Sequence, residues 1–370
     1  MKILHAADLH LDSPFRSLPR DKAVLRRSEQ RALLLRLTEL AAAEGPDLAL
    51  LAGDLFDSDL PHAETARLLT ETLNALRIPV FIAPGNHDPY HPGGLWDTLP
   101  LGDNVHVFRE ETLTRVDLPE HNACVWGCAF GGSYRASPLA DFRAPARETP
   151  TLQLAVMHAD AENAGSPYAP VSPAEIALSG LDYIAMGHLH YASGLRESGR
   201  TRYAWPGCAE GRGFDETGEK GVYITELIPD GHGEVHLRAD FHVLARRQYR
   251  ILSVDLTDTE DSYGALCAAL PEGTERDIYR LILTGRTAAA PDLPALRAAL
   301  EDRFFALELT DNTAPPVDLW AGADADTLRG LFLQRLYAQY EAADESRREA
   351  ILRAARWGLR AMENEEEAPL

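Results

Sequence analysis

The chain has 370 residues, of which 45% are hydrophobic and 25% charged, which is enough for a large globular domain with a second, smaller one. Its formal net charge of −21 disfavours a protein that coats nucleic acid or an acidic membrane by bulk attraction, although nucleic acid can still be held locally. Asp8 interrupts the first apolar stretch and no apolar run approaches transmembrane length, so we expect no signal peptide, no membrane association and a cytoplasmic protein.

The first two thirds of the chain alternate strand-like and helical patterns. Short apolar runs predict strands at residues 2–7, 47–52, 79–83, 123–127, 152–157, 181–186 and 221–227. Helical periodicity predicts helices at 22–43, ended by Gly45-Pro46, and at 62–76. This alternation indicates an α/β architecture with parallel pairs and additional antiparallel strands in the middle.

From Leu244 the pattern changes. Residues 249–312 predict strand, helix, strand, helix and strand in that order, which makes a small α+β unit. Pro315-Pro316 reads as a linker, and two amphipathic helices and an acidic tail follow it. We therefore expect three parts: residues 1–243, 244–314 and 315–370. The helices are predicted at 324–341, with Leu328, Leu331, Phe332, Leu336 and Tyr340 on one face, and at 345–362, with Ile351, Leu352, Ala355, Leu359 and Met362 on one face.

Polar side chains follow five of the apolar runs at the point where each run stops. They are Asp8 and His10; Asp54 and Asp57; Asn86, His87 and Asp88; His158; and His188 and His190. Loops at the carboxyl ends of the strands line the ligand crevice of an open α/β sheet, so these side chains would meet at one rim.

The residue types at this rim are those of a metal site. Imidazole, carboxylate and one amide oxygen, with no thiolate, suit Mn²⁺, Fe²⁺ or Zn²⁺ better than a structural cysteine-rich zinc site. The seven candidate ligands are Asp8, His10, Asp54, Asn86, His158, His188 and His190. Because these are too many for one tetrahedral ion, they predict two ions that share a bridging carboxylate, roughly 3.5–4 Å apart.

Taken singly, most of these fragments have a plainer explanation. An aspartate at a strand end is usually a turn or a helix cap, and a lone histidine such as His158 is more often a core or surface residue. The fragments GNHD and GHLH are harder to explain by packing. We expect the pairs Asp8/His10 and His188/His190 to point to one side by the period of two of an extended chain. The ordered set is what predicts a site.

The order DxH, GDxxD, GNHD, single His and GHxH resembles the calcineurin-like metallophosphoesterase superfamily, and within it the SbcD and YhaO group of DNA-repair exonuclease subunits. The likeness covers about residues 1 to 230. It implies a four-layer α/β/β/α sandwich with two Mn²⁺ ions, a small α+β capping domain, and C-terminal helices that bind a coiled-coil ATPase of the SbcC or Rad50 kind.

The resemblance also implies individual roles. It assigns one metal to Asp8, His10, Asp54 and His190, and the other to Asp54, Asn86, His158 and His188. His87 would stabilise or protonate the departing sugar oxygen while Asp54 bridges the ions. Asp57 and Asp88 would orient imidazoles and backbone, and Arg212, in the loop after GHLH, is the arginine expected to contact a phosphate.

Other residues fit plainer roles. His5, inside the first strand, is expected to be a core residue. Arg16, Arg20, Arg26 and Arg27 read as the solvated face of a helix, with DNA phosphates as the alternative partner. Trp96 and Tyr134 are expected to cap the sheet, with stacking on bases as the alternative.

These observations predict a Mn²⁺-dependent DNA phosphodiesterase. As the resemblance implies, it would be a 3′-to-5′ exonuclease with single-strand endonuclease activity, and the nuclease subunit of an SbcC/Rad50-like ATPase complex in DNA repair, bound through the C-terminal helices. Members of the family are commonly dimers, so a homodimer is possible. The chief alternative is a metallophosphatase or phosphodiesterase for a nucleotide or other small phosphate ester, since the surrounding loops select the substrate. A third is a non-catalytic subunit that organises an ATPase and DNA.

Overall fold

The computed structural model describes residues 1–145, 151–230, 235–316 and 318–363. Residues 364–370 of the predicted acidic tail lie outside the described residues. By its internal contacts the chain divides into two compact units, one of residues 1–252, 271–281 and 297–308, and one of residues 253–270, 282–296 and 309–370.

The first six-stranded sheet has the strand order β12-β11-β1-β2-β3-β4. Its strands are β1 (Lys2–Ala6), β2 (Leu48–Leu51), β3 (Val80–Ile82), β4 (Val105–Val107), β11 (Gly221–Pro229) and β12 (Val235–Val243). Strands β1 to β4 run parallel, whereas β11 is antiparallel to both β1 and β12. The predicted strands of this sheet are confirmed. The sequence did not predict the edge strand β12, whose exposed His236 and Arg238 interrupt the apolar pattern.

The second six-stranded sheet has the order β5-β6-β7-β8-β10-β9. Its strands are β5 (Thr114–Leu118), β6 (Ala123–Gly127), β7 (Leu152–His158), β8 (Tyr183–Gly187), β9 (Arg196–Ser198) and β10 (Thr201–Ala204). Strands β6, β7, β8 and β10 run parallel, and β5 and β9 pair antiparallel at the edges. The carboxyl ends of β7 and β8 therefore lie at the same edge of this sheet.

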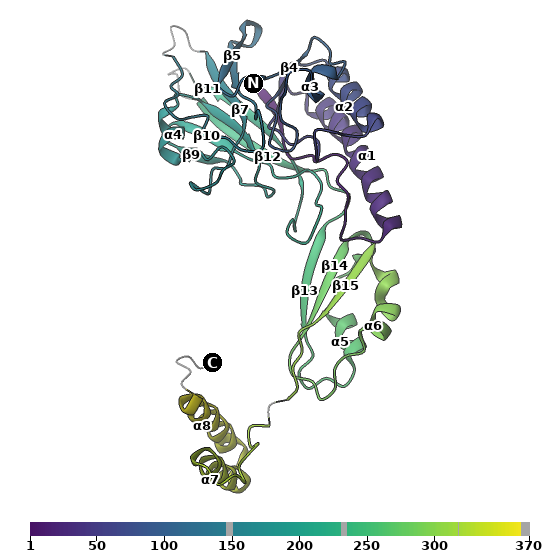
Figure 1. Ribbon diagram of the computed structural model, residues 1–370, viewed down its shortest axis with the longest axis vertical. Helices are drawn as coiled ribbons and strands as arrows, with labels where there is room; N and C mark the ends of the chain where they lie inside the picture. Colours follow the sequence, from purple (N-terminus) through teal and green to yellow (C-terminus); the bar gives the residue numbers. More distant parts are fainter. Residues whose placement is uncertain (146–150, 231–234, 317, 364–370) are drawn as a thin grey trace. The chain divides into compact units, whose positions relative to one another are not determined.

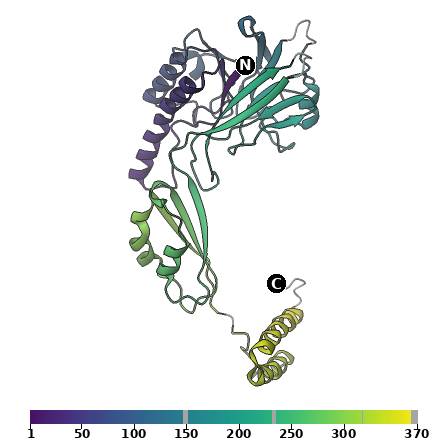
Figure 2. The same ribbon diagram turned by 180° about the vertical axis from the view of Figure 1, so that it is seen from behind.

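The two sheets pack face to face, and alternation along each strand decides which side chain enters which layer. Leu48 and Leu50 of β2 share a buried cluster with Leu154 of β7 and Tyr183 of β8. The alternate residues Ala49 and Leu51 belong to the cluster on the opposite face, which includes residues of the helices α1 (Arg20–Glu44) and α2 (Ala63–Ala75) on the outer side of the first sheet (Figures 1 and 2).

The short helix α4 (Pro173–Leu178) covers the outer face of the second sheet, where its Ile176 packs on Met157 and Ile184. Together with α1 and α2, this confirms the predicted four-layer α/β/β/α sandwich. The remaining short helices of this part are α3 (Leu95–Thr98) and η1 (Pro119–His121).

The third sheet is small, with the order β13-β14-β15. It confirms the predicted alternation of strand and helix after Leu244, and the division between the two compact units passes through its strands. Its elements are β13 (Tyr249–Asp255), α5 (Ser262–Ala269), η2 (Thr274–Arg276), β14 (Ile278–Thr284), α6 (Leu293–Leu300), η3 (Glu301–Arg303) and β15 (Ala306–Asp311).

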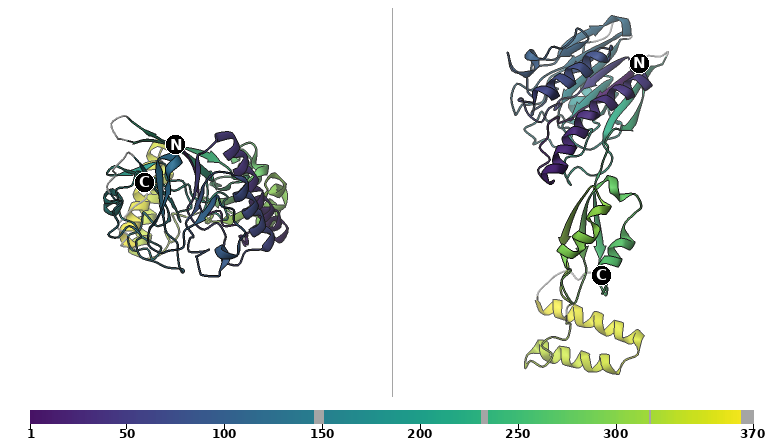
Figure 3. Two further views of the ribbon diagram at one scale, coloured as in Figure 1. Left: turned by 90° about the horizontal axis from the view of Figure 1, so that it is seen from above. Right: turned by 90° about the vertical axis from the view of Figure 1, so that its right-hand side faces the viewer.

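The last described elements are the helices α7 (Leu328–Ala342) and α8 (Glu345–Glu363), which lie antiparallel (Figure 3). The face predicted for α8 is confirmed in part, because Ile351, Ala355 and Leu359 are buried, Leu352 is half-buried and Met362 is exposed. The face predicted for α7 is wrong in part: Leu333 is the buried leucine of α7, and Leu328 and Leu331 are exposed. None of the described helices combines the length and the apolarity that crossing a membrane requires.

Candidate metal centre

The polar residues that follow the predicted strands converge at one edge of the two sheets. Three groups have ligand atoms within 4.8 Å of one another: Asp8, His10 and His190; His10, Asp54 and His87; and Asp8, Asp54 and His158. Asn86 Oδ1 lies 3.0 Å from His158 Nε2, and the ring centres of His188 and His158 are 5.2 Å apart. The structure therefore brings all seven predicted ligands and His87 together.

Left-handed backbone makes this convergence possible. Strand β1 ends at Ala6, and beyond it Asp8 and His10 have φ angles of 50° and 41°. Asp54 has a φ of 51° and His188 a φ of 93°. The extended geometry that we predicted for the pairs at 8/10 and 188/190 is therefore wrong, because a positive φ turns the chain within each pair. Each such residue costs on the order of 1–3 kcal/mol, and such strain is typical of functional sites.

Glycines allow the strand ends to approach one another. A Cβ on Gly53, whose φ is 83°, would lie 2.7 Å from His158 Nδ1. A Cβ on Gly85 would overlap the carboxylate of Asp54, and one on Gly187 would overlap the carbonyl oxygen of Ala52. The glycines of GD, GNHD and GHLH thus permit side chains of other strands to enter the centre.

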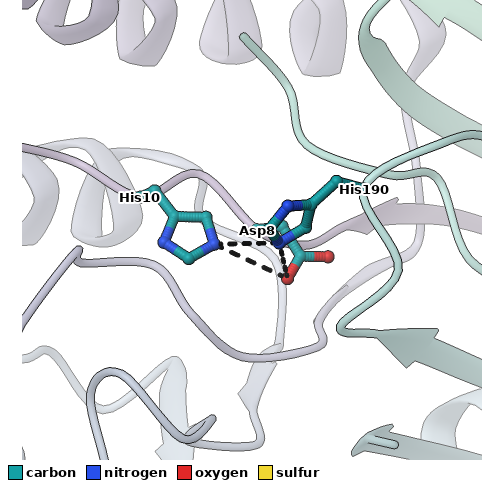
Figure 4. Close-up of side chains that lie close together, drawn as sticks. All are labelled: Asp8, His10 and His190. Carbon is teal, nitrogen blue, oxygen red and sulfur yellow. Dashed lines mark hydrogen bonds and ion pairs between the residues drawn. The ribbon is translucent and has the colours of Figure 1, made fainter. Parts of the chain in front are cut away.

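One half of the centre consists of Asp8, His10 and His190 (Figure 4). The Nε2 atoms of His10 and His190 are 3.2 Å apart, and each lies within 4.0 Å of Asp8 Oδ1. His10 Nε2 is also 3.7 Å from Asp54 Oδ2. Asp8 and His10 are completely buried, so these donor atoms face one another without bulk water between them.

Carboxylates lie beside the other nitrogen of both imidazoles. His190 Nδ1 is 2.8 Å from Glu216 Oε1, and His10 Nδ1 is 3.4 Å from Asp57 Oδ1. Such partners favour a proton on Nδ1 and leave Nε2 as a ligand. The position of Asp57 agrees with its predicted role. Sequence reasoning missed Glu216, which follows the last motif by 26 residues; the only signal was an acidic residue in a glycine-bearing loop.

Arg212 lies behind this half of the centre. Its Nη2 and Nε contact Glu216 at 2.6 and 3.1 Å, its Nη1 is 3.2 Å from Asp57 Oδ1, and its Nη2 is 3.0 Å from His190 Nδ1. The guanidinium thus holds the two carboxylates that flank the imidazoles. The predicted contact between Arg212 and a phosphate stays a prediction.

The other half of the centre contains His158, Asn86 and His188. His158 Nδ1 is 2.9 Å from the Ala52 carbonyl oxygen, and its Nε2 faces Asn86 Oδ1 at 3.0 Å and Asp54 Oδ2 at 3.3 Å. The backbone N–H of His188 donates to both carboxylate oxygens of Asp8, at 3.1 and 3.0 Å. His188 Nε2 lies 3.9 Å from Asp160 Oδ2, a second acidic neighbour that sequence reasoning missed.

His87 and Asp88 have different positions although they are adjacent. The side chain of His87 is exposed, and its Nδ1 is 3.0 Å from the Asp57 carbonyl oxygen. The backbone N–H of His87 donates to Asp54 Oδ1 at 2.9 Å. Asp88 is buried and accepts backbone N–H bonds, at 2.8–3.2 Å, from Gly85, Asp54, Leu55 and Phe56. Its geometry agrees with the predicted role in orienting backbone.

Trp96 and Tyr134, the two aromatic residues expected to cap the sheet, differ in burial. Trp96 is buried, and its Nε1–H donates to the Asp88 carbonyl oxygen at 2.6 Å, which confirms its packing role. Tyr134 is 65% exposed and lies against Tyr168, with ring centres 5.5 Å apart, so it does not cap the sheet. His5 is buried, as predicted.

The pKa values follow from burial and from the shared carboxylate. Burial opposes the charge of Asp54, but His158 and His10 outweigh burial and hold the pKa of Asp54 well below its ordinary value. Burial alone would lower the pKa of His158, yet Asp54 and Asp8 raise it to about 9. Burial lowers the pKa of His10 and of His188 to about 4, so both are neutral imidazoles at pH 7.

The donor atoms fit a divalent metal. If Nδ1 of His10 and of His190 carries the hydrogen toward its carboxylate, the two Nε2 atoms direct lone pairs at each other across 3.2 Å. A cation at this point would relieve that repulsion. Neutral His10 and His188 and ionised Asp54 are the protonation states that metal binding requires, whereas His158 must release its proton when a metal binds.

Comparison with known proteins agrees with this geometry. The family model of the calcineurin-like phosphoesterases matches residues 1–192. The chain belongs to the calcineurin-like phosphoesterase family, a class of metal-dependent hydrolases.

Its relatives include proteins of DNA metabolism. Over 238 residues it is 30% identical to the uncharacterized metallophosphoesterase YhaO of Bacillus subtilis, covering 61% of this chain and 57% of that protein. It is 29% identical to the DNA double-strand break repair protein Mre11 of Aeropyrum pernix, covering 72% and 66%. It is 32% identical to the SbcD subunit of the nuclease SbcCD of Rhodobacter capsulatus, covering 55% and 51%. The chain thus spans between half and two thirds of the length of these relatives.

Proposed function

We propose that the protein is a Mn²⁺-dependent DNA phosphodiesterase, a 3′-to-5′ exonuclease with single-strand endonuclease activity that serves as the nuclease subunit of an SbcC/Rad50-like ATPase complex in DNA repair. The observation that carries the proposal is the pair of ligand groups that share Asp54 beside the exposed His87. DNA as the substrate is supported by two relatives, which are named a DNA double-strand break repair protein and a nuclease subunit.

In this proposal the seven buried or half-buried side chains divide between two ions. Asp8, His10 and His190 would hold one, Asn86, His158 and His188 the other, and Asp54 both. Two bound divalent ions would supply a hydroxide at neutral pH and offset the negative charge that develops on the phosphoryl oxygens. The chain itself keeps the donor atoms within contact distance, and burial of Asp8, His10 and His158 excludes bulk water.

His87 is the residue best placed to act on the leaving group. Its Nδ1 is 3.0 Å from the Asp57 carbonyl oxygen, which can only accept, so Nδ1 carries a hydrogen and Nε2 is free to hold the second proton. The ring centre of His87 lies 4.8 Å from that of His10, next to the donor atoms. A protonated His87 can therefore donate to the sugar oxygen that departs.

The rest of the chain would serve the partners. We propose that residues 244–314 form the capping domain and that residues 315–370 contain the surface that binds the ATPase. Four large apolar side chains of α7 and α8 support this assignment, because they stay exposed when the two helices pack against each other. They are Leu328, Leu331, Trp357 and Met362. Docking of a second protein would also reconcile a net charge of −21 with DNA, since the partner can provide much of the DNA-binding surface. A homodimer remains part of the proposal.

The test uses end-labelled duplex and single-stranded DNA beside a nitrophenyl phosphodiester, with Mn²⁺ or Mg²⁺, with and without the partner ATPase. We expect Mn²⁺-dependent cleavage of DNA. Asp54→Asn should lose on the order of a thousandfold in rate with both substrates, since several kcal/mol of charge stabilisation is removed. His87→Ala should lose about a hundredfold with DNA, and much less with the nitrophenyl ester, whose leaving group needs no proton.

Arg67→Met, which removes an exposed ion pair with Glu71 on α2, is the matched control and should leave the rates unchanged. Cleavage of the nitrophenyl ester with DNA left intact, even with the ATPase added, would overturn the nuclease proposal in favour of a small phosphate ester. Full activity of Asp54→Asn would overturn the site.

A further inference from the structure

Arg26 lies inside the protein, although the sequence pattern placed it on a solvated helix face. It belongs to α1, and its side chain is completely buried on the inner face of this helix. Its Nη1 donates to Glu210 Oε1 at 2.7 Å and to Glu29 Oε2 at 2.9 Å, and its Nη2 donates to the Gly211 carbonyl oxygen at 2.9 Å. The solvated-face interpretation is therefore wrong for Arg26. Its neighbour Arg27, on the same turn, makes a long contact with the Pro14 carbonyl oxygen, at 3.4 Å.

The carboxylate that Arg26 meets is buried as well. Glu210 is 1% exposed; its Oε2 accepts from Arg36 Nη2 at 3.2 Å and from the Arg246 N–H at 3.3 Å. Glu210 and Gly211 are thus tied to α1 by a guanidinium that fits both groups at once. A buried charge pair of this kind is weak evidence for stability alone, since an apolar pair of the same volume can serve equally well.

Arg212, the residue after Gly211, lies directly behind the metal centre. Arg212 contacts Asp57 and Glu216, and these carboxylates lie 3.4 Å from His10 Nδ1 and 2.8 Å from His190 Nδ1. Arg26 therefore stands at the start of a continuous series of contacts that ends at both imidazoles of one half of the centre. The half that contains His158 is held differently, because His158 Nδ1 meets the backbone carbonyl oxygen of Ala52 and not a carboxylate of this loop.

We propose that Arg26 is a positioning residue: by fixing Glu210 and Gly211 it sets the position of Arg212 and Glu216, and through them the orientation of His10 and His190 toward their shared ion. This inference rests on the proposed function. It distinguishes the two halves of the centre, because the position of Arg26 should matter for the ion held by His10 and His190 and not for the ion held by His158.

The experiment measures Mn²⁺ binding to the full chain by electron paramagnetic resonance of the free ion, which gives the number of sites and the affinity of each. Arg26→Lys keeps the charge but loses the fork that reaches two acceptors. Arg26→Met removes the charge and leaves Glu210 with less compensation. Arg26→Met combined with Glu210→Gln removes that residual charge, so it is the variant best suited to fold. Arg67→Met is the control.

We expect the wild type and Arg67→Met to bind two ions. Each Arg26 variant that folds should bind one ion with unchanged affinity and the other about 10- to 100-fold more weakly, the usual loss when a group that orients a metal ligand is removed. Thermal unfolding in EDTA reports stability without metal. Two ions bound with wild-type affinity in a folded variant would overturn the inference, as would weakening of both ions in proportion to a lower unfolding temperature. A wild type that binds fewer than two ions would instead overturn the proposed function.

Discussion

The two halves of the candidate metal centre orient their imidazoles by different means. His10 and His190 face carboxylates of Asp57 and Glu216, which a buried arginine network positions. His158 is held by the carbonyl oxygen of Ala52, a backbone group at the end of β2. Both kinds of acceptor fix the tautomer and the orientation of the ring and raise its basicity, but a carboxylate also brings a negative charge next to the metal ligand.

This difference determines which substitutions can change the orientation of the imidazoles in each half of the centre. The carboxylate-held half depends on side chains from the loop after β10, so a substitution there can change it and leave the sheets intact. The carbonyl-held half is part of the sheet edge itself, and no side-chain removal can take the Ala52 carbonyl away. The contact that holds His158 is therefore lost only when the backbone moves, whereas His188 has the carboxylate of Asp160 beside it.

The largest effect is expected from Gly187→Ala. The added Cβ would overlap the carbonyl oxygen of Ala52 and lie 3.0 Å from His158 Nδ1, so the ends of β2 and β8 must separate. We expect about 2 kcal/mol of lost unfolding free energy, as for other overpacked sites, and on the order of a hundredfold loss of phosphodiester hydrolysis from displaced groups. Urea unfolding in EDTA and a rate assay measure the two effects.

The matched control is Gly132→Ala. Gly132 has open space around its Cβ position and no positive φ, so alanine there should change neither quantity. If Gly187→Ala were as active as Gly132→Ala, the close approach of the two strand ends would not matter for the centre, and the comparison between backbone-held and side-chain-held halves would fail.

A smaller and more local effect is expected from Glu216→Gln. The amide keeps the shape of the side chain and an oxygen for the Nδ1–H of His190, but it removes the charge that Arg212 and the imidazole share. We expect about tenfold weaker binding of one Mn²⁺ ion, at the lower end of the usual range for such changes, with the second ion unaffected. Free Mn²⁺ measured during a titration gives both affinities.

Glu71→Gln, which changes an exposed glutamate paired with Arg67, serves as the control because surface ion pairs contribute little. Equal weakening of both ions by Glu216→Gln would show that the loop supports the centre as a whole, and the two halves would then not be independent.

The sequence contained the residue types of the centre but not the geometry that joins them. The ligands could be predicted because each follows a recognisable apolar run and the runs are parallel strands with a common edge. The turns at Asp8 and His188 could not be predicted, since a positive φ in a non-glycine residue is imposed by the surrounding fold. The four clustered arginines looked alike in the sequence, and the buried carboxylate that pairs with Arg26, Glu210, comes 184 residues later in the chain.

The same reasoning applies to the fold. Buried strands such as β2 and β7 were predicted because apolar side chains fill both their faces. The sequence did not indicate β9 or β12, because edge strands carry exposed polar residues, and their pairing depends on the surrounding sheet. In α7 the buried leucine is Leu333 and not the predicted Leu328 and Leu331, because the partner helix α8 decides which of several apolar residues is covered.

The smallest effect is expected at a histidine outside the metal centre, whose hydrogen-bond partners are neutral groups. His5 is buried in β1, and its nitrogens lie 2.8 Å from the Tyr183 hydroxyl and 2.9 Å from the Met186 carbonyl oxygen, both neutral groups. Burial lowers its pKa from 6.5 to about 4. The folded protein therefore binds fewer protons than the unfolded chain between these pH values, so this histidine contributes stability that is present above pH 6.5 and is lost as the pH falls toward 4.

Replacement by glutamine, His5→Gln, removes the titrating group and keeps polar atoms for the same neighbours. Between pH 7 and about pH 5.5, roughly one unit below the ordinary pKa, we expect the wild type to lose about 1 kcal/mol more unfolding free energy than His5→Gln. Urea unfolding at the two pH values, with EDTA present so that metal binding does not contribute, gives the difference directly. The same pH dependence in both proteins would mean that burial among neutral groups does not suppress the charge of His5.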